Sequence, residues 1–380
     1  MSLEERLKKH AFRFERLVIR RVVTRPATTP FYDSTMGPFN DFPYFWLTLY
    51  DEDGTYGEAP CSERINLMFP RLLLDGSKRS YYDWHSHLYW QIRNRGFRSE
   101  AASELGSIDI AIHDIMAKRE GLALHRFWGA TRDSVTVYGS GAGINLDESA
   151  VAKELSDFVA AGYDTVKMKV GSDWGTDVER DVRRVAAARK AIGPDVRLAI
   201  DANQCWTAGQ ALRFIDRVAK YDIAWFEEPV HSADLVAMRE LGEECPIGIA
   251  AGESERTYFG FRDMASVGVK QLQPCIMKLP AVLDWMKVRD LTIERGLELT
   301  SGGFSPLTAA FIATASEDSL TEYLVPLLSI FIETLGKKPE LRDGCFYLSS
   351  DPGLPIQPEW EKLENGGLVT EVIHFHKKNM

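Results

Sequence analysis

The chain has 380 residues, of which 45% are hydrophobic and 26% charged, and a formal net charge of −10. This length and composition are typical of a globular protein with more than one domain and argue against disorder. The negative charge argues against nucleic acid or an anionic membrane as a partner. The five cysteines are widely spaced and odd in number, so we expect neither a disulfide framework nor a zinc site. No long apolar run or leader pattern is present, and we expect a soluble, cytoplasmic protein with no membrane partner.

The N-terminal third mixes strands and helices without a regular alternation. Residues 12–23 alternate between apolar and polar side chains, as in a strand, and residues 45–58 predict a hairpin around an acidic turn with Gly54. Residues 103–119 have the apolar spacing of a helix. Between the first two elements lies a loop, residues 24–41, rich in Pro, Thr and aromatic side chains. This part of the chain therefore predicts an α+β arrangement.

Strands and helices alternate from about residue 134 onward. Amphipathic helical patterns separate strand-like runs at 135–138, 166–170, 196–200, 223–226, 247–252, 268–274, 297–300 and 322–325. Asp201, Glu227 and Glu253 follow successive runs at intervals of 26 residues. A strand–helix unit repeated at this length predicts a (β/α)8 barrel, whose active site lies at the carboxyl ends of the strands.

Two lysines share one face of the run at 166–170. Side chains alternate across a strand, so Lys167 and Lys169 point to one side and Val166, Met168 and Val170 to the other. Placing two ammonium groups together on an apolar strand is costly unless they have partners. The alternative is an edge strand that turns both lysines to solvent.

Three carboxylates at successive strand ends indicate a cation site. Asp201, Glu227 and Glu253 would converge at one rim of a barrel, where close carboxylates repel each other unless a cation lies among them. Ligation by oxygen atoms alone suits a hard ion, Mg²⁺ above Zn²⁺.

Four motifs together resemble those of the enolase superfamily, and within it the mandelate racemase and muconate lactonizing enzyme-like members. They are Lys167-x-Lys169, Asp201-Ala-Asn203, Trp225-Phe-Glu227-Glu228-Pro229 and Ala251-Gly-Glu253-Ser254. The resemblance covers nearly the whole chain. It implies an α/β fold with a modified (β/α)8 TIM-type barrel at 134–328, an N-terminal α+β capping domain at 1–133, and a C-terminal segment, 329–380, that packs back on the capping domain.

The resemblance also implies roles for the site residues. Asp201, Glu227 and Glu253 would be the ligands of a Mg²⁺ ion. Lys169 would be the base on the second barrel strand, and Lys167 its neighbour near the carboxylate of the substrate. We expect this lysine and the metal to depress the pKa of Lys169 to about 7–8, where an amine is a useful base.

Further residues are implied as substrate contacts. Glu322 matches a position whose carboxyl group donates to the substrate carboxylate when protonated, or otherwise orients it; the alternative is an ordinary strand-end glutamate. Asn203 belongs to the motif of the third strand. The loop at 24–41 would fold over the barrel mouth, with Phe31 and Tyr32 against substrate, unless it is only a surface loop.

The sixth and seventh strands depart from the family pattern. Racemases of this family carry an Asp on the sixth strand that pairs with a His on the seventh, and the lactonizing subgroup carries a Lys on the sixth strand. Here the sixth-strand position holds Cys275, and no His lies between His231 and His374. Lys270 at the start of the strand and Lys278 beyond its end do not convincingly replace the missing base. Cys275 could act only as a stabilised thiolate, and a small buried filler is the favoured alternative.

These features predict abstraction of the α-proton of a small carboxylate to give an ene-diolate, with Mg²⁺ as a Lewis acid. Only one face of the substrate clearly has a base, Lys169. A single base suits dehydration of an acid sugar or related hydroxy acid. The alternatives are a racemase, epimerase or cycloisomerase with an unrecognised second group, or a relative that binds a carboxylate without turnover. Because relatives usually assemble, we expect a homo-oligomer.

Overall fold

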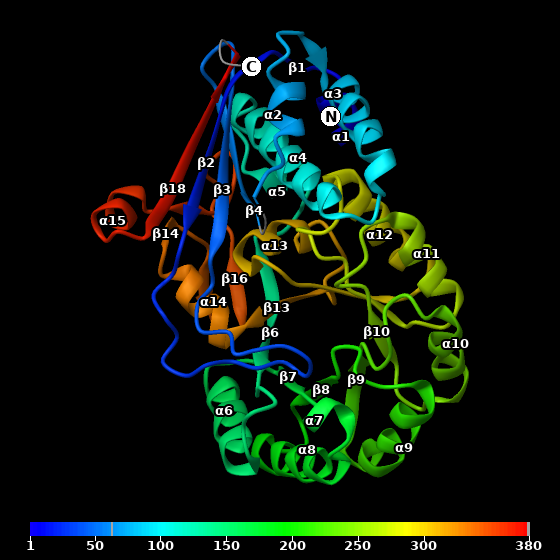
Figure 1. Cartoon of the computed structure of the whole chain (residues 1–380). Helices are drawn as coiled ribbons and strands as arrows, with labels where there is room; N and C mark the ends of the chain where they lie inside the picture. The colour runs from blue at the N-terminus through cyan, green and yellow to red at the C-terminus, as the bar shows by residue number, and fades with distance from the viewer. Residues whose placement is uncertain (62–63, 378–380) are drawn as a thin grey trace.

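The computed structural model describes residues 1–61 and 64–377. Figure 1 shows an eight-stranded barrel in the lower part of the view and an antiparallel sheet with its helices above it. The predicted fold class is confirmed: the protein is α/β, with a TIM-type parallel barrel and an N-terminal α+β cap. Within the described residues, no helix combines the length and the apolar character needed to cross a membrane.

The cap is built on a four-stranded antiparallel sheet in the order β18 (Val369–His376), β2 (Phe14–Val22), β3 (Tyr44–Asp51) and β4 (Tyr56–Cys61). The predicted hairpin is confirmed as β3 and β4. The long helix α4 (Glu100–Arg119) packs on this pair so closely that a Cβ atom at Gly57 would lie 1.9 Å from the carbonyl oxygen of Ala111. The smaller cap elements are α1 (Leu3–Leu7), β1 (Ala11–Phe12), α2 (Met68–Leu73), β5 (Arg79–Ser80), α3 (Tyr81–Tyr89), the 3₁₀ helix η1 (Trp90–Arg95) and α5 (Leu124–Phe127).

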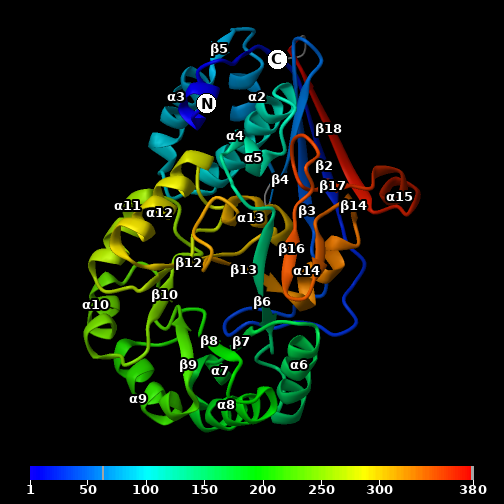
Figure 2. The ribbon, with the colours of Figure 1, turned by 180° about the vertical axis from the view of Figure 1, so that it is seen from behind.

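The barrel closes because its eighth strand pairs with its first. Its parallel strands are β6 (Ser134–Gly141), β7 (Thr165–Lys169), β8 (Arg197–Asp201), β9 (Ile223–Glu227), β10 (Ile249–Ala251), β11 (Gln271–Leu272), β12 (Glu298–Ser301) and β13 (Leu320–Leu324), and β13 pairs back with β6. The helices around it are α6 (Glu148–Ala160), α7 (Ser172–Gly175), α8 (Val178–Ile192), α9 (Ala208–Val218) with η2 (Ala219–Tyr221), α10 (Leu235–Glu244), α11 (Tyr258–Ser266), α12 (Val282–Arg295), α13 (Ser305–Ile312) and α14 (Val325–Ile332). Seen from behind in Figure 2, α6 and the helices α8 to α12 lie on the outside of the barrel, while the short α7 lies inside this ring.

The fifth and sixth strands are shorter than the sequence predicts. β10 ends at Ala251, before Gly252 with its φ of +129°, so Glu253 lies on the segment that follows the strand. β11 contains only Gln271 and Leu272. The N–H of Gln273 still donates to the carbonyl oxygen of Ala251 at 3.0 Å, but Pro274 comes next, and a proline has no N–H to continue the ladder. Cys275 is therefore on a turn past the strand and not on the strand itself.

The chain after residue 328 contacts both parts of the molecule. β16 (Cys345–Tyr347) pairs antiparallel with barrel strand β6, and β15 (Glu340–Arg342) pairs with β16. β18 pairs along its length with β2 of the cap. The remaining elements of this segment are β14 (Leu335–Lys337), β17 (Gln357–Pro358) and α15 (Trp360–Asn365). The boundaries at 133 and 328 remain predictions.

A buried arginine cross-links the backbone at the rim of the barrel, near the second strand, through hydrogen bonds. The guanidinium of Arg184 on α8 is fully buried and donates to the carbonyl oxygens of Lys169 at 2.8 Å, Ala142 at 3.0 Å, Gly143 at 2.8 Å and Leu146 at 3.0 Å. It also pairs with the buried carboxylate of Asp181 at 3.1 Å. These bonds join the segment after β6 to the end of β7, and so fix the backbone that carries Lys169.

Replacing Arg184 with methionine is expected to lower the free energy of unfolding by about 3–5 kcal/mol, because Asp181 would remain buried without its cationic partner. Chemical denaturation measures the change. Arg183 is the matched control, because it is the next residue on α8 and its ion pair with Glu148 is exposed. Arg183→Met should leave the midpoint nearly unchanged. Equal denaturation midpoints for the two variants would contradict a stabilising role for the buried hydrogen bonds of Arg184.

Candidate active site

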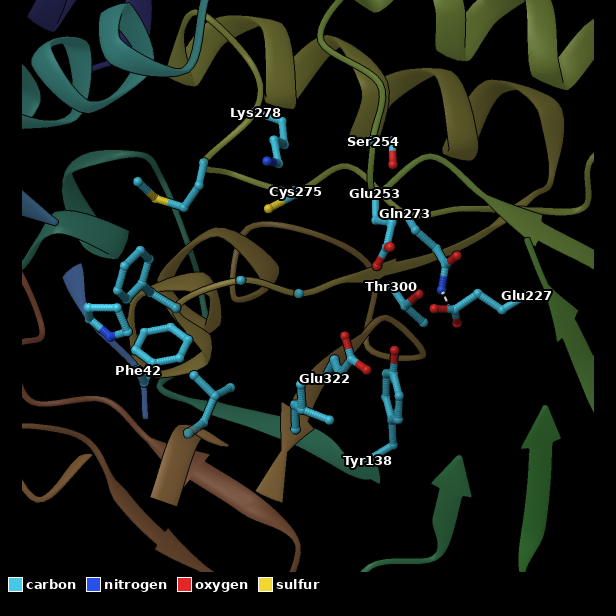
Figure 3. Close-up of a pocket in the computed structure, with 17 residues that line it drawn as sticks. Phe42, Tyr138, Glu227, Glu253, Ser254, Gln273, Cys275, Lys278, Thr300 and Glu322 are labelled. Atoms are coloured by element: carbon cyan, nitrogen blue, oxygen red, sulfur yellow. Dashed lines mark hydrogen bonds between the residues drawn. The ribbon is translucent and has the colours of Figure 1, made fainter. Parts of the chain in front are cut away.

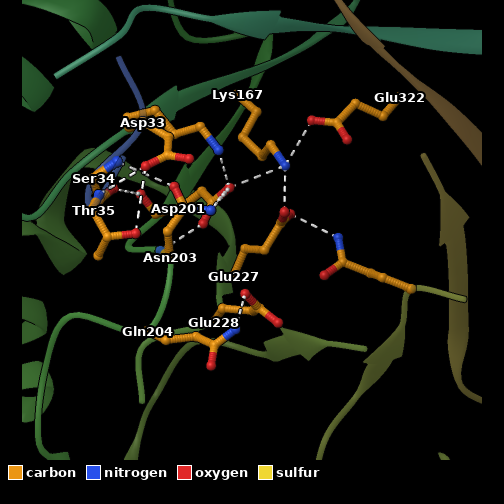
Figure 4. Close-up of polar contacts among 12 residues, drawn as sticks. Asp33, Ser34, Thr35, Lys167, Asp201, Asn203, Gln204, Glu227, Glu228 and Glu322 are labelled. Atoms are coloured by element: carbon orange, nitrogen blue, oxygen red, sulfur yellow. Dashed lines mark hydrogen bonds and ion pairs between the residues drawn. The ribbon is translucent and has the colours of Figure 1, made fainter. Parts of the chain in front are cut away.

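The two lysines of β7 point into the barrel and not to solvent. Lys167 is 1% exposed and Lys169 is 5% exposed, and their strand lies between β6 and β8. The alternative of a solvated edge strand is therefore wrong. Figure 4 shows the ammonium group of Lys167 among the carboxylates of Asp201, Glu227 and Glu322.

Three carboxylates surround the ammonium group of Lys167. Its Nζ atom lies 2.8 Å from Oε1 of Glu322 on β13 and 3.3 Å from Oδ2 of Asp201 at the end of β8, and it also contacts Glu227 at the end of β9. Lys169 contacts Asp201 in turn. The structure thus brings together both predicted lysines and three of the predicted carboxylates, because β7, β8, β9 and β13 all end at this rim.

Glu227 has two further partners that the sequence did not indicate. Its Oε2 atom accepts a hydrogen bond from Nε2 of Gln273 at 2.7 Å and another from Nε1 of Trp225 at 3.1 Å. Trp225 could have been found, because it is two residues before Glu227 and thus on the same face of β9. Burial, assisted by the nearby carboxylates, outweighs Lys167 and raises the pKa of Glu227 to about 8.

Two more acidic side chains lie close to this cluster. Burial and the Asp201 carboxylate raise the pKa of Glu253, which has no hydrogen bond or ion pair to any described residue. Burial raises the pKa of Glu228 well above its usual range, and Glu253 and Asp201 add to the effect. Oε2 of Glu228 accepts from Gln204 at 2.8 Å, while its buried Oε1 has no partner among the described residues. Glu228 was not among the predicted site residues.

The donor set of this rim suits a hard cation. No three His, Cys, Asp or Glu side chains in the described ranges converge closely enough to hold a metal ion as they are now oriented, because the two ammonium groups lie among the carboxylates. Acidic groups nevertheless outnumber the two lysines: they are Asp201, Glu227, Glu228, Glu253 and Glu322. Burial, with the neighbouring carboxylates adding to it, disfavours the charged forms of Glu228 and Glu253, and Mg²⁺ would favour those forms and provide a partner for the unpartnered oxygen of Glu228 and for Glu253.

The expected depression of the Lys169 pKa is not observed. Burial and the charge of Lys167 do lower the pKa of Lys169, but Asp201, together with Glu253 and Glu322, outweighs them and the pKa is raised. The pKa of Lys167 is raised well above its usual range by its carboxylate partners, Glu227 foremost, against the effect of burial. The predicted depression concerned Lys167 together with Mg²⁺, and for the site with the ion it remains a prediction.

Glu322 is held in its charged form. Burial would raise its pKa, but Lys167 and then Lys169 lower it further, so that the pKa is below its usual range. In this arrangement the partner of Glu322 is Lys167, and the predicted contact of Glu322 with the substrate carboxylate remains a prediction.

Asn203 connects the third strand to the loop at 24–41. Its backbone N–H donates to Oδ1 of Asp201 at 2.9 Å, and its side-chain oxygen accepts from the backbone N–H of Ser34 at 3.3 Å. The Ser34 hydroxyl donates to the carbonyl oxygen of Asp201 at 3.2 Å. Asn203 does not line the pocket described below, so its predicted contact with substrate remains a prediction.

The aromatic side chains at the tip of this loop pack on the loop itself. Phe31 is buried and stacks on Phe39, with 6.3 Å between the ring centroids, and the ring of Tyr32 lies against Gly37. Neither lines the pocket, whereas Phe42 and Pro43 just beyond the loop do. A substrate contact for Phe31 or Tyr32 is therefore still only predicted, and the aromatic residue from this part of the chain that lines the pocket is Phe42.

A pocket of about 440 Å³ lies at the rim between barrel and cap. Its polar side chains are Tyr138, Glu227, Glu253, Ser254, Gln273, Lys278, Thr300 and Glu322, and the rest of the lining is Phe42, Pro43, Cys275, Met277, Gly302, Gly303, Phe304, Leu324 and Leu328. In Figure 3, Phe42 lies on the side of the pocket away from Glu227 and Gln273. One end is thus acidic and the other apolar.

Fold and site together define a capped (β/α)8-barrel enzyme, with its lysines on the second strand and its acidic groups on and just after the strands that follow. Residues 150–362 match the family model described as enolase C-terminal domain-like. The chain belongs to the enolase superfamily, as a mandelate racemase/muconate lactonizing enzyme-like protein, and the resemblance noted in the sequence is confirmed.

Characterised relatives span more than one reaction. The chain is 32% identical over 353 residues to D-galactarolactone cycloisomerase of Agrobacterium fabrum, which covers 87% of this chain and 92% of the relative. It is 29% identical over 273 residues to L-talarate/galactarate dehydratase of Salmonella typhimurium, covering 71% and 67%. Among solved structures, a racemase from Streptomyces coelicolor with bound magnesium superposes with a TM-score of 0.83 at 26% identity, covering 94% of this chain and all of the other.

Proposed function

We propose that this protein catalyses the Mg²⁺-dependent abstraction of the α-proton of a carboxylate to give an ene-diolate, leading to dehydration of an acid sugar or a related hydroxy acid. The observation that carries the proposal is the buried contact of Lys167 and Lys169 with Asp201, Glu227 and Glu322 beside a pocket. The acid-sugar relatives and the magnesium bound in a similar structure support it.

The chain's own groups divide the work of the first step. Lys169, as the neutral amine, takes the α-proton, and Glu322 and Glu227 hold Lys167 as an ammonium group that pairs with the substrate carboxylate. Asp201, Glu227 and Glu253 would hold a Mg²⁺ ion that, when bound, stabilises the negative charge of the ene-diolate as a Lewis acid.

The second step distinguishes the candidate reactions. In dehydration, the electrons of the ene-diolate expel the β-hydroxyl group, and the resulting enol becomes an α-keto acid. A racemase, epimerase or cycloisomerase instead needs a group that returns or directs a proton on another face. A carboxylate-binding relative would perform neither step. Dehydration remains the proposal, because within residues 1–61 and 64–377 only β7 presents lysines in contact with these carboxylates.

The apolar end of the pocket narrows the hydroxy acids to be tried first. Phe42, Phe304 and Leu328 line it, and the rings of Phe42 and Phe304 pack edge to face at 5.5 Å. A hydroxyl group placed there would lose its hydrogen bonds to water without gaining others. A hydroxy acid whose far end is apolar therefore fits this wall better than one that is hydroxylated throughout.

We expect a screen of hydroxy acids to give formation of an α-keto acid together with exchange of the substrate α-hydrogen in D₂O. The panel should contain pairs that differ only in a terminal CH₃ or CH₂OH group. EDTA is expected to abolish both signals and Mg²⁺ to restore them. Exchange without keto acid would instead support the isomerase alternative, and saturable binding without exchange the non-catalytic one. Full activity after EDTA treatment would refute the metal assignment.

A further inference from the structure

The sixth barrel strand faces the second across the barrel. In the closed order of eight strands, β11 is four strands from β7 in either direction. A side chain that enters the pocket from the end of β11 therefore approaches a bound substrate from the face opposite Lys169. This is the face that the sequence left without an acid or base.

Cys275 does not provide an acid or base on that face. Its side chain is buried, and burial raises the pKa of the thiol more than the nearby Lys278 ammonium group lowers it. The thiolate that base catalysis requires is thus disfavoured. Cys275 instead packs below Gly303, where an added Cβ atom would lie 3.1 Å from the cysteine Sγ.

Lys278 reaches the pocket from the same turn. Pro274 ends the strand ladder, and the turn that follows is closed by a hydrogen bond from the N–H of Lys278 to the carbonyl oxygen of Cys275 at 3.0 Å. Lys278 is half-buried and lines the pocket. Figure 3 shows it beside Cys275, on the wall across from Glu322 and Tyr138. From the sequence, Lys278 was expected beyond the strand end and was not predicted to replace the missing base, because a turn at this point could not be predicted.

The ammonium group of Lys278 is not engaged elsewhere. Among the side chains listed above as lining the pocket, it is the one cation. Its Nζ atom forms no ion pair or hydrogen bond with any residue in the ranges 1–61 and 64–377, whereas Lys167 and Lys169 are both paired. A half-buried lysine with no partner at a substrate pocket is available to donate to what binds there.

We infer that Lys278 is the catalytic acid of the second step and acts from the face opposite Lys169. This rests on the proposed function. Lys169 takes the α-proton, the bond between the β-carbon and its hydroxyl oxygen breaks as the carbon–carbon double bond forms, and a proton of the Lys278 ammonium group goes to the departing oxygen. Water leaves, and Lys278 recovers its proton from solvent. Elimination is then anti.

The test uses the hydroxy acid that shows the fastest α-hydrogen exchange in the screen. Lys278→Ala is expected to lower the rate of keto-acid formation by about 10²–10⁴-fold, while exchange of the α-hydrogen stays within a few fold of wild type. Lys278→Arg keeps the charge but is a far weaker proton donor, so dehydration should stay low. Lys270→Ala, at the exposed start of the same segment, is the matched control and should be unchanged. A thermal melt of each variant, with Lys278→Met as a second truncation, separates loss of fold from loss of the acid.

Three results would overturn the inference. Near wild-type dehydration by Lys278→Ala or Lys278→Met would show that no acid acts from this turn. Recovery of the rate by Lys278→Arg would show that charge, and not proton transfer, is needed. Syn elimination would place the acid on the face of Lys169. A failure of the proposed function gives different results. Either the wild-type protein would exchange the α-hydrogen of no carboxylate tested, or the Lys169→Ala variant would still exchange the α-hydrogen. The inferred role of Lys278 would then be refuted as well.

Discussion

Replacing Lys169 with alanine should abolish both keto-acid formation and exchange of the substrate α-hydrogen with D₂O. Loss of a positioned base costs about 10²–10⁴-fold in rate, and Lys278 on the opposite face cannot reach the same proton. Exchange followed by NMR reports the first step directly, whatever the later steps are. Retained exchange would show that another group takes the proton.

Two lysine variants serve as comparisons for that result. Lys153→Ala removes an exposed lysine on α6 that pairs with Asp157, and should change nothing. Lys167→Ala should be slow but should still exchange, with a different pH dependence. Because the charge of Lys167 lowers the pKa of Lys169, its loss raises that pKa. The neutral amine then forms only at higher pH, and the rising limb of the pH–rate profile moves to higher pH.

Glu253→Gln should remove Mg²⁺ binding and turnover without lowering the stability of the metal-free protein. Glu253 has no hydrogen bond or ion pair among the described residues that would be broken, and its raised pKa means that folding disfavours the charged form. Near neutral pH, an uncharged side chain there relieves that cost, so the melting temperature without metal should be equal or higher. The stabilisation that Mg²⁺ gives the wild-type protein should be absent.

Calorimetric titration with Mg²⁺ and melting curves with and without the ion measure these effects. Glu243→Gln, an exposed glutamate on α10, is the control and should bind Mg²⁺ as wild type does. Asp201→Asn should lose binding as well, but at a cost in stability, because Asp201 is in contact with both lysines. Wild-type Mg²⁺ affinity in Glu253→Gln would remove Glu253 from the ligand set.

The part of the site that the sequence predicts is the part that follows from strand periodicity. Lys167 and Lys169 share a face because a strand alternates, and Asp201 and Glu227 meet them because parallel strands end at one rim. The same local rules could not place Lys278, since its position depends on a strand that ends early at Pro274 and on the turn after it.

Contacts between segments that are distant in the sequence could not be predicted either. Nothing local indicates that Phe31 packs on its own loop while Phe42 reaches the pocket, or that Gln273 donates to Glu227. The direction of the Lys169 pKa shift in this arrangement of the side chains also lies beyond local rules, because it depends on the contact with Asp201. Electrostatic energies between buried groups follow geometry that spacing along the chain does not contain.

The pairing of β2 with β18 joins residues 16–22 to residues 369–376 within one sheet. A ribosome makes β2 before the barrel and β18 after it, so β2 has an open edge while the barrel between them is made. Open strand edges invite pairing with other chains, and domains otherwise tend to fold as they emerge. The cap sheet, from which the loop at 24–41 extends toward the barrel, is therefore completed after the barrel. The segment that extends toward the active site therefore belongs to a sheet that lacks one strand until the whole barrel has been made.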